Sequence, residues 1–419
     1  MAAAPTITGF PPRASQIRLV VLMTALSAMS YFNRTIMSIA GPGIMREFGI
    51  SETSMGTVYS SFLLSYTVCM GFGGALADRF GAKRTLFLAG LCASGFTALT
   101  AMCGPAGIGA YFGVVTAFIT VRFLFGVVSA PLYPSTARIS SDQIAPSAQS
   151  SVQAIVMAGA AVGAAVSPVL FSRLIGSIGW RPSFLLAAAA TLALMLAWYF
   201  TVPDSAPRDH KRVSARAAWG KLLTDRDLLM LTLGYFMLNY FEYIFFYWIY
   251  YYFGEIRKMG AEMGALATTI MFVSMAIMTP FGGWLSDRVG VRLGRRLGRR
   301  SVSMAGMALS AVLLFWGASG VGVAATVALL ALALGCCTMA EGPYWATAID
   351  LGREKAGASC GIMNTGGNVG GMLAPVITPL IATRFGWAGG LYFASFLVLL
   401  GVITWLWVNP ERHGLPEPG

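Results

Sequence analysis

The chain has 419 residues, of which 56% are hydrophobic and only 11% are charged, and it carries a formal net charge of +12. Because soluble domains have about 25% charged residues, this sequence has too few polar side chains to cover a surface in water. The composition excludes a soluble protein and predicts one that lies in a membrane.

Twelve apolar runs follow one another along the chain, and most approach the roughly 20 residues that cross a bilayer as a helix. They lie at 18–40, 54–77, 85–104, 108–133, 150–173, 181–202, 227–252, 263–284, 301–319, 322–347, 361–383 and 387–409. Backbone groups in hydrocarbon must be hydrogen-bonded within their own segment, so such runs predict helices. We expect an all-α membrane protein with twelve transmembrane helices. No small-residue cleavage site follows a run, so we expect no removable signal peptide.

The basic residues between the runs are unevenly distributed. With both termini placed on one side of the membrane, 21 Lys and Arg residues fall on that side and 6 fall on the other. Cytoplasmic loops carry such an excess, so we expect both termini in the cytoplasm. The positive charge therefore indicates orientation in a lipid bilayer and not a nucleic-acid partner.

Residues that bind metals or carry catalysis are sparse. The 6 cysteines fall inside or at the ends of the runs without zinc-type spacing, and the 2 histidines, His210 and His413, lie in loops. We find no nucleophile elbow and no G-x-x-x-x-G-K-[ST] loop for nucleotide phosphates. We expect no metal, no cofactor and no enzymatic activity.

The longest polar segment, 203–226, divides the runs into two sets that echo one another. The segment GGALADRFGAKR at 73–84 returns as GGWLSDRVGVRLGRR at 282–296, and Trp180 returns as Trp387, 207 residues later. Such repeats indicate a duplicated six-helix unit. We expect a bundle at 1–202, a cytoplasmic loop at 203–226 and a second bundle at 227–419.

This organisation resembles the major facilitator superfamily, in which two parallel six-helix halves enclose a substrate site near the middle of the membrane. The segments 73–84 and 282–296 are similar to its helix 2–3 motif, and RFLFG at 122–126 is similar to its helix 4 motif. Arg34 and GIMNTGGNVGGMLAPV at 361–376 resemble one branch, the organic anion:cation symporters. The resemblance implies a secondary transporter of a small organic anion, such as a sugar acid, that works by alternating access.

Arg34 and Arg122 are the cations that we expect inside the apolar runs. Charged residues within a membrane are costly, face the bundle interior and mark paths for substrates or ions. Arg34 lies about 16 residues into its helix, near the expected middle of the membrane, and its planar guanidinium suits a carboxylate. We predict that Arg34 binds the substrate anion; a structural pair with a glutamate is the alternative. For Arg122, substrate binding and a structural or gating role are equally open.

Two carboxylates, Glu242 and Glu341, lie in apolar runs of the second half. Burial favours a neutral carboxyl group and a nearby arginine favours its charged form, so such a group can load and release a proton as its exposure alternates. Glu341 also begins EGPYW, whose Gly-Pro pair breaks a helix. We predict proton-coupling or gating roles for both. A neutralising partner for Arg34 or Arg122 is the alternative.

Other polar side chains in the runs are candidate substrate ligands. Tyr240, Tyr243 and Tyr247 have three- and four-residue spacing and are expected on one helix face, from which Tyr243 and Tyr247 can reach a substrate. Buried amides on glycine-rich or polar faces add Gln153, Asn364 and Asn368. Ordinary packing or hydrogen bonding between helices is the alternative for each of them.

The resemblance also implies a conformational latch at the cytoplasmic ends of the helices. Its residues would be Gly74, Asp78 and Arg79 in the first half and Gly283, Asp287 and Arg288 in the second. The glycines let helices approach closely, and the aspartates can accept from a helix N-terminus or pair with arginines of the facing half. Ordinary positive-inside charge is the alternative.

The chain departs from this branch at two positions. Proton-coupled members carry an acidic residue before the helix 1 arginine and another on helix 4, where this chain has Asn33 and Ser129. Either proton coupling has moved to Glu341 and Glu242, or the protein is a uniporter or exchanger of an organic anion.

We therefore expect a carrier of a small organic anion, with or without coupling to protons. A carrier of a neutral or cationic solute and a transporter-like sensor that binds without transport are the alternatives. We expect a monomer in the inner membrane of a bacterium.

Overall fold

The computed structural model describes residues 13–144, 146–203 and 222–409, and all regular elements of these residues are helices. The first half contains α1 (Arg13–Phe48), α2 (Glu52–Phe80), α3 (Ala82–Thr100), α4 (Gly109–Phe112), α5 (Val114–Ser129), α6 (Leu132–Gln143), α7 (Pro146–Ile178) and α8 (Trp180–Thr201). The second contains α10 (Arg226–Tyr247), α11 (Ile249–Tyr251), α12 (Gly260–Leu293), α13 (Arg295–Ala318), α14 (Val323–Thr338), α15 (Glu341–Gly352) and α16 (Ala356–Thr404), with a π-helical turn at Tyr252–Ile256 and a 3-10 turn at Arg353–Lys355.

Every one of the expected apolar runs falls on these helices. Nine helical stretches of the described residues are long and apolar enough to cross a membrane. One of them, α16, contains two of the expected runs, which Gly386 separates with a φ of +70°. Glycine adopts such a φ without the steric cost that a side chain adds, so the chain can turn there between two spans. The predicted all-helical membrane fold is confirmed.

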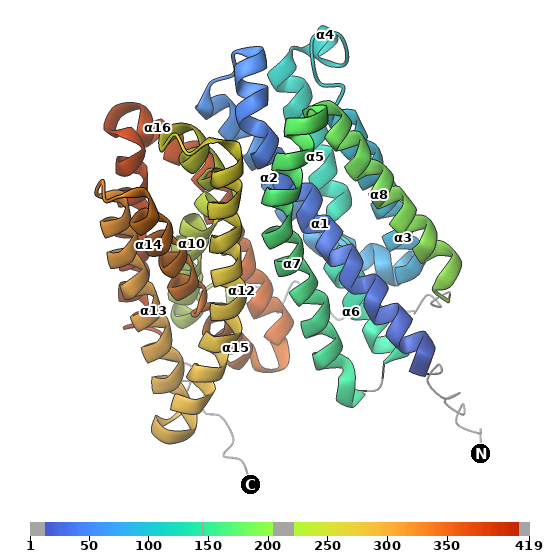
Figure 1. The fold of residues 1–419 in the computed structure, drawn as a ribbon. Coiled ribbons are helices and arrows are strands. Elements are labelled where there is room, and N and C mark those ends of the chain that lie inside the picture. Colours follow the sequence, from blue (N-terminus) through green and yellow to red (C-terminus); the bar gives the residue numbers. More distant parts are fainter. Residues whose placement is uncertain (1–12, 145, 204–221, 410–419) are drawn as a thin grey trace, which may run out of the picture.

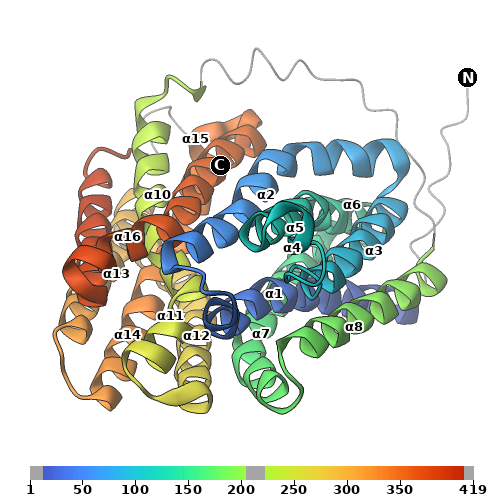
Figure 2. The same cartoon turned by 90° about the horizontal axis from the view of Figure 1, so that it is seen from above.

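The helices form two groups. In Figure 1, α1 to α8 lie together in blue and green, and α10 to α16 lie together in yellow to red. Seen from above, α2 lies beside α16 at one seam between the groups, and α7 lies beside α12 at the other (Figure 2). The sequence repeat matches α2 to α12 and α7 to the first part of α16, so the two seams are equivalent. The fold is a pair of pseudo-symmetric six-helix bundles.

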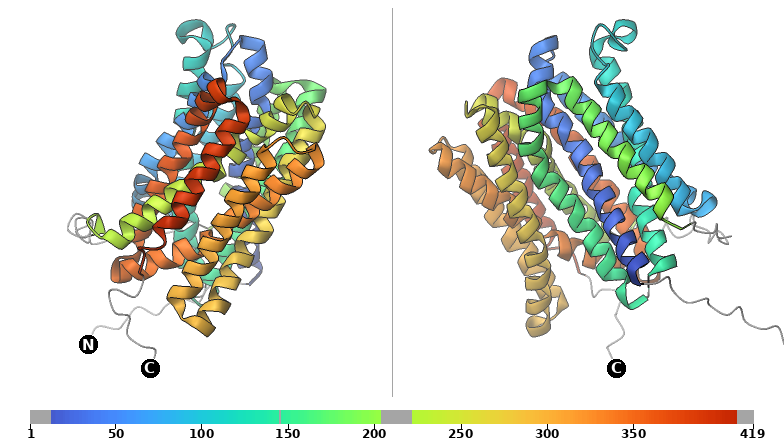
Figure 3. Two further views of the ribbon diagram at one scale, coloured as in Figure 1. Left: turned by 90° about the vertical axis from the view of Figure 1, so that its left-hand side faces the viewer. Right: turned by 45° about the vertical axis from the view of Figure 1, so that its right-hand side comes forward.

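The long helices of each group run alongside one another (Figure 3). Two of the spans are interrupted at equivalent places, between α5 and α6 and between α14 and α15. Between α5 and α6 the interruption includes Pro131, and α15 has Pro343 in its first turn. Proline has no N–H to donate and fits best in the first turn of a helix, so each proline here suits the start of a new helix after the interruption. The second interruption makes Glu341 the first residue of α15.

Glycines bring α16 against α10. A Cβ atom at Gly370 would lie 2.1 Å from the carbonyl oxygen of Phe236, and one at Gly371 would lie 2.7 Å from the ring of Tyr243. Small residues of this kind let helix backbones approach closely in membranes. The glycine-rich segment of the sequence therefore determines how near α10 lies to α16 and supports the ring of Tyr243.

Candidate functional site

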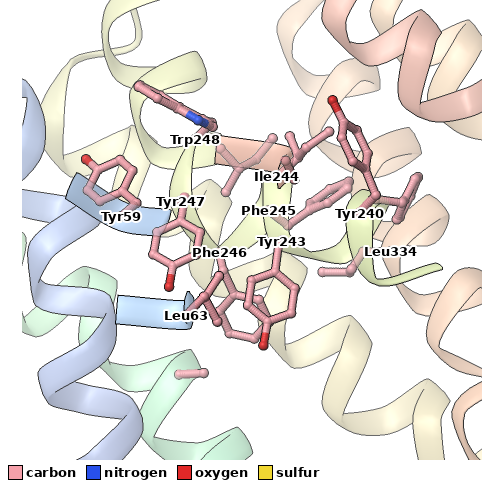
Figure 4. Close-up of a cluster of buried hydrophobic side chains, with 14 of the residues drawn as sticks. Tyr59, Leu63, Tyr240, Tyr243, Ile244, Phe245, Phe246, Tyr247, Trp248 and Leu334 are labelled. Atoms are coloured by element: carbon pink, nitrogen blue, oxygen red, sulfur yellow. The ribbon is translucent and has the colours of Figure 1, made fainter. Parts of the chain in front are cut away.

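Arg34 lies in α1 and its side chain is buried against α10 of the other half. Its Nη2 donates a 2.6 Å hydrogen bond to the hydroxyl of Tyr243, and its Nε donates one of 3.5 Å to the hydroxyl of Tyr247. In Figure 4 the hydroxyl groups of these two tyrosines point the same way. Tyr240 does not join them, because its hydroxyl pairs with Thr378 of α16 at 3.2 Å.

Aromatic rings surround the guanidinium of Arg34. Its Cζ lies 4.9 Å from the ring centroid of Tyr243, 5.1 Å from that of Phe62, 5.4 Å from that of Tyr31 and 5.7 Å from that of Phe246. Such rings attract a cation without neutralising it. Among the described residues, no carboxylate forms an ion pair with Arg34. Sequence reasoning missed Tyr31, Phe62 and Phe246, because aromatic residues are ordinary members of apolar runs.

Arg122 of α5 is 1% exposed and lies close to the ring of Phe62, which also contacts Arg34. Its Cζ is 5.3 Å from the centroid of Phe62 and 4.7 Å from that of Phe125. Its Nη1 donates to the backbone carbonyl of Asn33 at 3.4 Å, and its Nε has no hydrogen-bond partner. The structure therefore brings Arg34 and Arg122 together around Phe62, with no carboxylate paired to either among the residues that it describes.

Asn33 points away from its neighbour Arg34 and into the first bundle. Its Nδ2 donates to Thr191 of α8 at 2.8 Å, and its Oδ1 is buried without a partner. Asn33, Ser129 and Thr191 line a cavity of about 50 Å³ between α1, α3, α5 and α8, whose other walls are mostly apolar. The two positions at which the resemblance would place acidic residues thus lie on one small cavity inside the first bundle.

Glu341 and Glu242 meet in the second bundle. Glu341 accepts hydrogen bonds from the hydroxyl of Tyr235 at 2.9 Å and from Nε1 of Trp345 at 3.2 Å. The buried carboxyl group of Glu242, on α10, lies within hydrogen-bonding reach of Glu341. Neither forms an ion pair with an arginine of the described residues. The sequence singled out both glutamates, but their pairing with each other was not foreseen.

The three candidate amides lie in different places. Nδ2 of Asn364 is 3.4 Å from the sulfur of Met70 on α2, across a seam between the halves, and Asn368 is buried. Gln153 lies 14 residues before Ser167, whose hydroxyl pairs with Thr35 beside Arg34. At 1.5 Å per residue, Gln153 is therefore about 21 Å along α7 from the level of Arg34. The structure does not bring Gln153 to Arg34.

The expected latch is described only in part, because Gly74 and Asp78 lie outside the residues whose side chains the structure describes. Arg79 lies over the ring of Phe80 at 5.3 Å, and Arg288 lies over the ring of Trp284 at 5.6 Å. A Cβ atom on Gly342 would lie 3.1 Å from Cα of Gly283, so the glycine does mark a close approach of α12 and α15. Asp287 forms no ion pair within the described parts of the chain.

The two halves are joined at the end of the bundle that holds the C-terminus of α1. Arg46 pairs with Glu255 at 3.4 Å, and the hydroxyl of Tyr251 donates to Glu52 at 2.5 Å. Deeper in the protein, Tyr59 of α2 stacks on Tyr247 of α10 with a ring separation of 5.0 Å (Figure 4). Tyr247 therefore contacts both Arg34 and Tyr59, and its stacking on Tyr59 links the two halves.

Comparisons of the sequence identify its relatives. The profile of the Major Facilitator Superfamily matches residues 23–293 and 289–419. A probable sulfoacetate transporter of Cupriavidus necator is 26% identical, over 94% of this chain and 97% of its own length. A hexuronate transporter of Bacillus subtilis is 26% identical, over 92% of this chain and 94% of its own length. A probable galactarate/D-glucarate transporter of Escherichia coli is 25% identical, with coverage of 93% and 92%.

Solved structures share the fold at low sequence identity. A bacterial homolog of the human lysosomal transporter Spinster, in an inward-facing and unoccupied conformation, has a TM-score of 0.80 at 13% identity over 95% of this chain and 98% of that one. A D-xylose–proton symporter has a TM-score of 0.74 at 16% identity, with coverage of 96% and 100%. With a profile match that covers nearly the whole chain and the same two-bundle fold, the chain belongs to the major facilitator superfamily.

Proposed function

We propose that the protein is a secondary transporter that binds a small organic anion at Arg34 and carries it across the membrane by alternating access. The burial of Arg34 among neutral partners is the observation that carries this proposal. A buried charge is costly unless it is paired, and a guanidinium cannot lose its proton in a protein. A carboxylate of the substrate would supply the missing negative charge with a bidentate geometry.

The relatives support the same class of substrate. The printed names of three of them specify sulfoacetate, hexuronate and galactarate or D-glucarate, which are all organic anions. Because Arg122 also lies close to the ring of Phe62, a second acidic group or a hydroxyl of the substrate could be held in its neighbourhood. Tyr243 and Tyr247 would then orient the guanidinium of Arg34 and add hydroxyl contacts to the substrate.

We further propose that Glu242 and Glu341 carry the coupling proton. Two carboxyl groups within hydrogen-bonding reach can share a proton, and repulsion disfavours the state in which both are charged. Tyr235 and Trp345 donate to Glu341 and hold it in place. The second candidate is a uniporter or exchanger of the same anion, which the uncharged Asn33 and Ser129 favour.

The orientation and organisation expected from the sequence complete the proposal. We place both termini in the cytoplasm of a bacterium, with bundles at 1–202 and 227–419 joined by a cytoplasmic loop, and a monomer as the working unit. The contacts at the C-terminal end of α1 would then close the outer side of the protein, as in an inward-facing state.

Thermal unfolding of the purified protein with a panel of organic acids tests the anion site. A ligand that binds the folded state raises its apparent stability. We expect sulfonated or sugar-derived acids to raise the midpoint for the wild type, and Arg34→Ala to lose this shift. Arg13→Ala at the exposed start of α1 is the matched control and should keep it. An equal shift in Arg34→Ala, or an equal shift with neutral analogues, would refute Arg34 as the anion site.

Reconstituted liposomes test the coupling separately. With a substrate gradient imposed, a pH-sensitive dye should report proton movement for the wild type, and Glu341→Gln should transport without moving protons or lose uptake against a gradient. Transport by the wild type without proton movement would favour the uniporter or exchanger. Binding without any transport would overturn both and identify a sensor.

A further inference from the structure

An apolar groove on the second bundle is separate from the site around Arg34. It has a volume of about 290 Å³ and lies between α12 and α13, with α14 as its floor. Leu285 lines it from α12, Ala305 and Leu309 line it from α13, and Cys336 and Met339 form the floor. Leu309 is 51% exposed, so the groove is continuous with the outer surface of the bundle, which faces lipid in a membrane.

Small residues explain why the groove exists. A Cβ atom at Gly306 would lie 2.5 Å from the carbonyl oxygen of Cys336, and one at Gly282 would lie 2.2 Å from that of Met339. These glycines draw α14 against both α12 and α13. Because Gly306 and Ala305 add almost no side-chain volume of their own, the space above the floor stays unfilled. Its mostly apolar walls suit a hydrocarbon chain.

Arginines continue the walls of the groove toward the hairpin between α12 and α13. Residues at three-, four- and seven-residue spacing share a helix face, so Arg288 and Arg292 follow Leu285 on α12. By the same spacing, Arg295 precedes the groove residue Val302 on α13. Among the described residues, none of these three arginines forms an ion pair. Arg292 and Arg295 are exposed at the helix ends, where the hairpin leaves the apolar part of the bundle.

Arginines are more numerous around the hairpin between α12 and α13 than basic residues are around the equivalent hairpin of the first half. The equivalent segment of the first half, 73–84, has the basic residues Arg79, Lys83 and Arg84. Its counterpart, 282–296, has Arg288, Arg292, Arg295 and Arg296, and Arg299 and Arg300 follow on α13, where Arg299 is paired with Asp350. An orientation signal alone would not require the additional arginines that follow on α13. Arginines that form no ion pair within the described part of the chain, next to an apolar groove, favour a ligand that is anionic at one end and apolar at the other.

We propose that this groove binds an anionic phospholipid. One acyl chain lies over Cys336 and Met339, and the phosphate group is held by Arg292 and Arg295, with Arg288 beside them. Basic pockets between transmembrane helices at the membrane surface bind anionic head groups, and arginine binds phosphate with a fork of donors. The proposed lipid site does not involve the transported substrate, so it can be tested independently of the proposed transport function.

Thermal unfolding of the full chain in detergent, with added phosphatidylglycerol or phosphatidylcholine, tests the proposal. We expect phosphatidylglycerol to raise the midpoint and phosphatidylcholine of the same chain length to have a much smaller effect. The double variant Arg292→Gln/Arg295→Gln should lose more than half of the phosphatidylglycerol shift. Arg13→Gln/Arg18→Gln removes two exposed arginines from the start of α1 and should keep the shift.

A second variant tests the groove with every arginine intact. Ala305→Trp fills the space above the floor and should also reduce the phosphatidylglycerol shift, while the unliganded protein still unfolds cooperatively. Equal shifts with both lipids, or a full shift in the arginine variant, would overturn the proposal. If inorganic phosphate alone reproduces the shift and Ala305→Trp leaves it unchanged, the site binds free phosphate and the lipid assignment is wrong.

Discussion

Nη2 of Arg34 on α1 lies 2.6 Å from the hydroxyl of Tyr243 on α10, and this hydrogen bond joins the two halves of the protein in its interior. A tyrosine hydroxyl can orient a guanidinium without cancelling its charge, whereas a carboxylate would do both. The contact therefore keeps Arg34 fixed and still attractive to an anion. A change at the proposed anion site would therefore act directly on the boundary between the bundles.

Tyr243→Phe should weaken this arrangement without disturbing the packing, because the ring contact with Arg34 at 4.9 Å is retained. Hydrogen bonds between helices in membranes contribute about 0.6 kcal/mol on average and up to about 1.7 kcal/mol. We expect unfolding free energy to fall by about 1 kcal/mol and the anion-induced thermal shift to shrink. Tyr240→Phe is the matched control, since its hydroxyl pairs with Thr378. If both variants respond to anions alike, Tyr243 has no special role at the site.

Much of the fold follows from local sequence, and the contacts of Arg34 show where such reasoning ends. Apolar length predicts the spans, and the four-residue spacing of Tyr243 and Tyr247 places both hydroxyls on Arg34. Which helix of the other half faces Arg34 depends on how the bundles pack, which no single segment encodes. Phe62 is an example: its ring lies close to both Arg34 and Arg122, yet its place in an apolar run looks like that of any other phenylalanine.

The glutamates illustrate the same limit. Besides a proton-coupling or gating role, a carboxylate in an apolar run suggests an arginine partner as the alternative, because opposite charges are the simplest way to balance a buried group. In the structure Glu341 is held by Tyr235 and Trp345 and lies beside Glu242. The interruption between α14 and α15 places Glu341 there, and the Gly-Pro pair after it predicts the interruption but not the direction in which Glu341 points.

Gly370→Ala should separate α16 from α10. The added Cβ would lie 2.1 Å from the carbonyl oxygen of Phe236, so one backbone must move. Overpacking of this kind typically costs about 1–3 kcal/mol of unfolding free energy. We expect a cost at the upper end of this range, because the clashing atom belongs to the backbone and cannot move as a side chain can. Gly357→Ala, near the start of the same helix, meets nothing within 4 Å and should be neutral or slightly stabilising. Equal unfolding midpoints for the two variants would contradict the close approach.

Acid should weaken the contact between α1 and α8 at Glu47, which lies beyond the apolar run of α1. Hydrogen bonds from Arg181 and Trp180, both 2.7 Å long, hold the pKa of the Glu47 carboxyl below its usual value. Its contribution to stability is therefore present above the unfolded pKa of about 4.3 and is lost as pH falls through the lower folded value. The difference in unfolding midpoint between wild type and Glu47→Gln should be constant near neutral pH and shrink in acid. Added salt should reduce it, because both side chains are partly exposed. A difference that grows on acidification would contradict this assignment.

Thr191→Val should leave the amide of Asn33 without its partner beside the small cavity of the first bundle. Nδ2 of Asn33 donates to Thr191 at 2.8 Å, and valine keeps the shape of threonine but offers no acceptor. Within the range found for hydrogen bonds between membrane helices, we expect a loss of about 1 kcal/mol in unfolding free energy. Thr191→Ser keeps the hydroxyl and should lose less. An unpaired buried polar group costs more than the absence of both partners, so Asn33→Leu/Thr191→Val should recover part of the loss. A double-mutant cycle measures this coupling, and strictly additive effects would show that the Asn33–Thr191 contact contributes nothing.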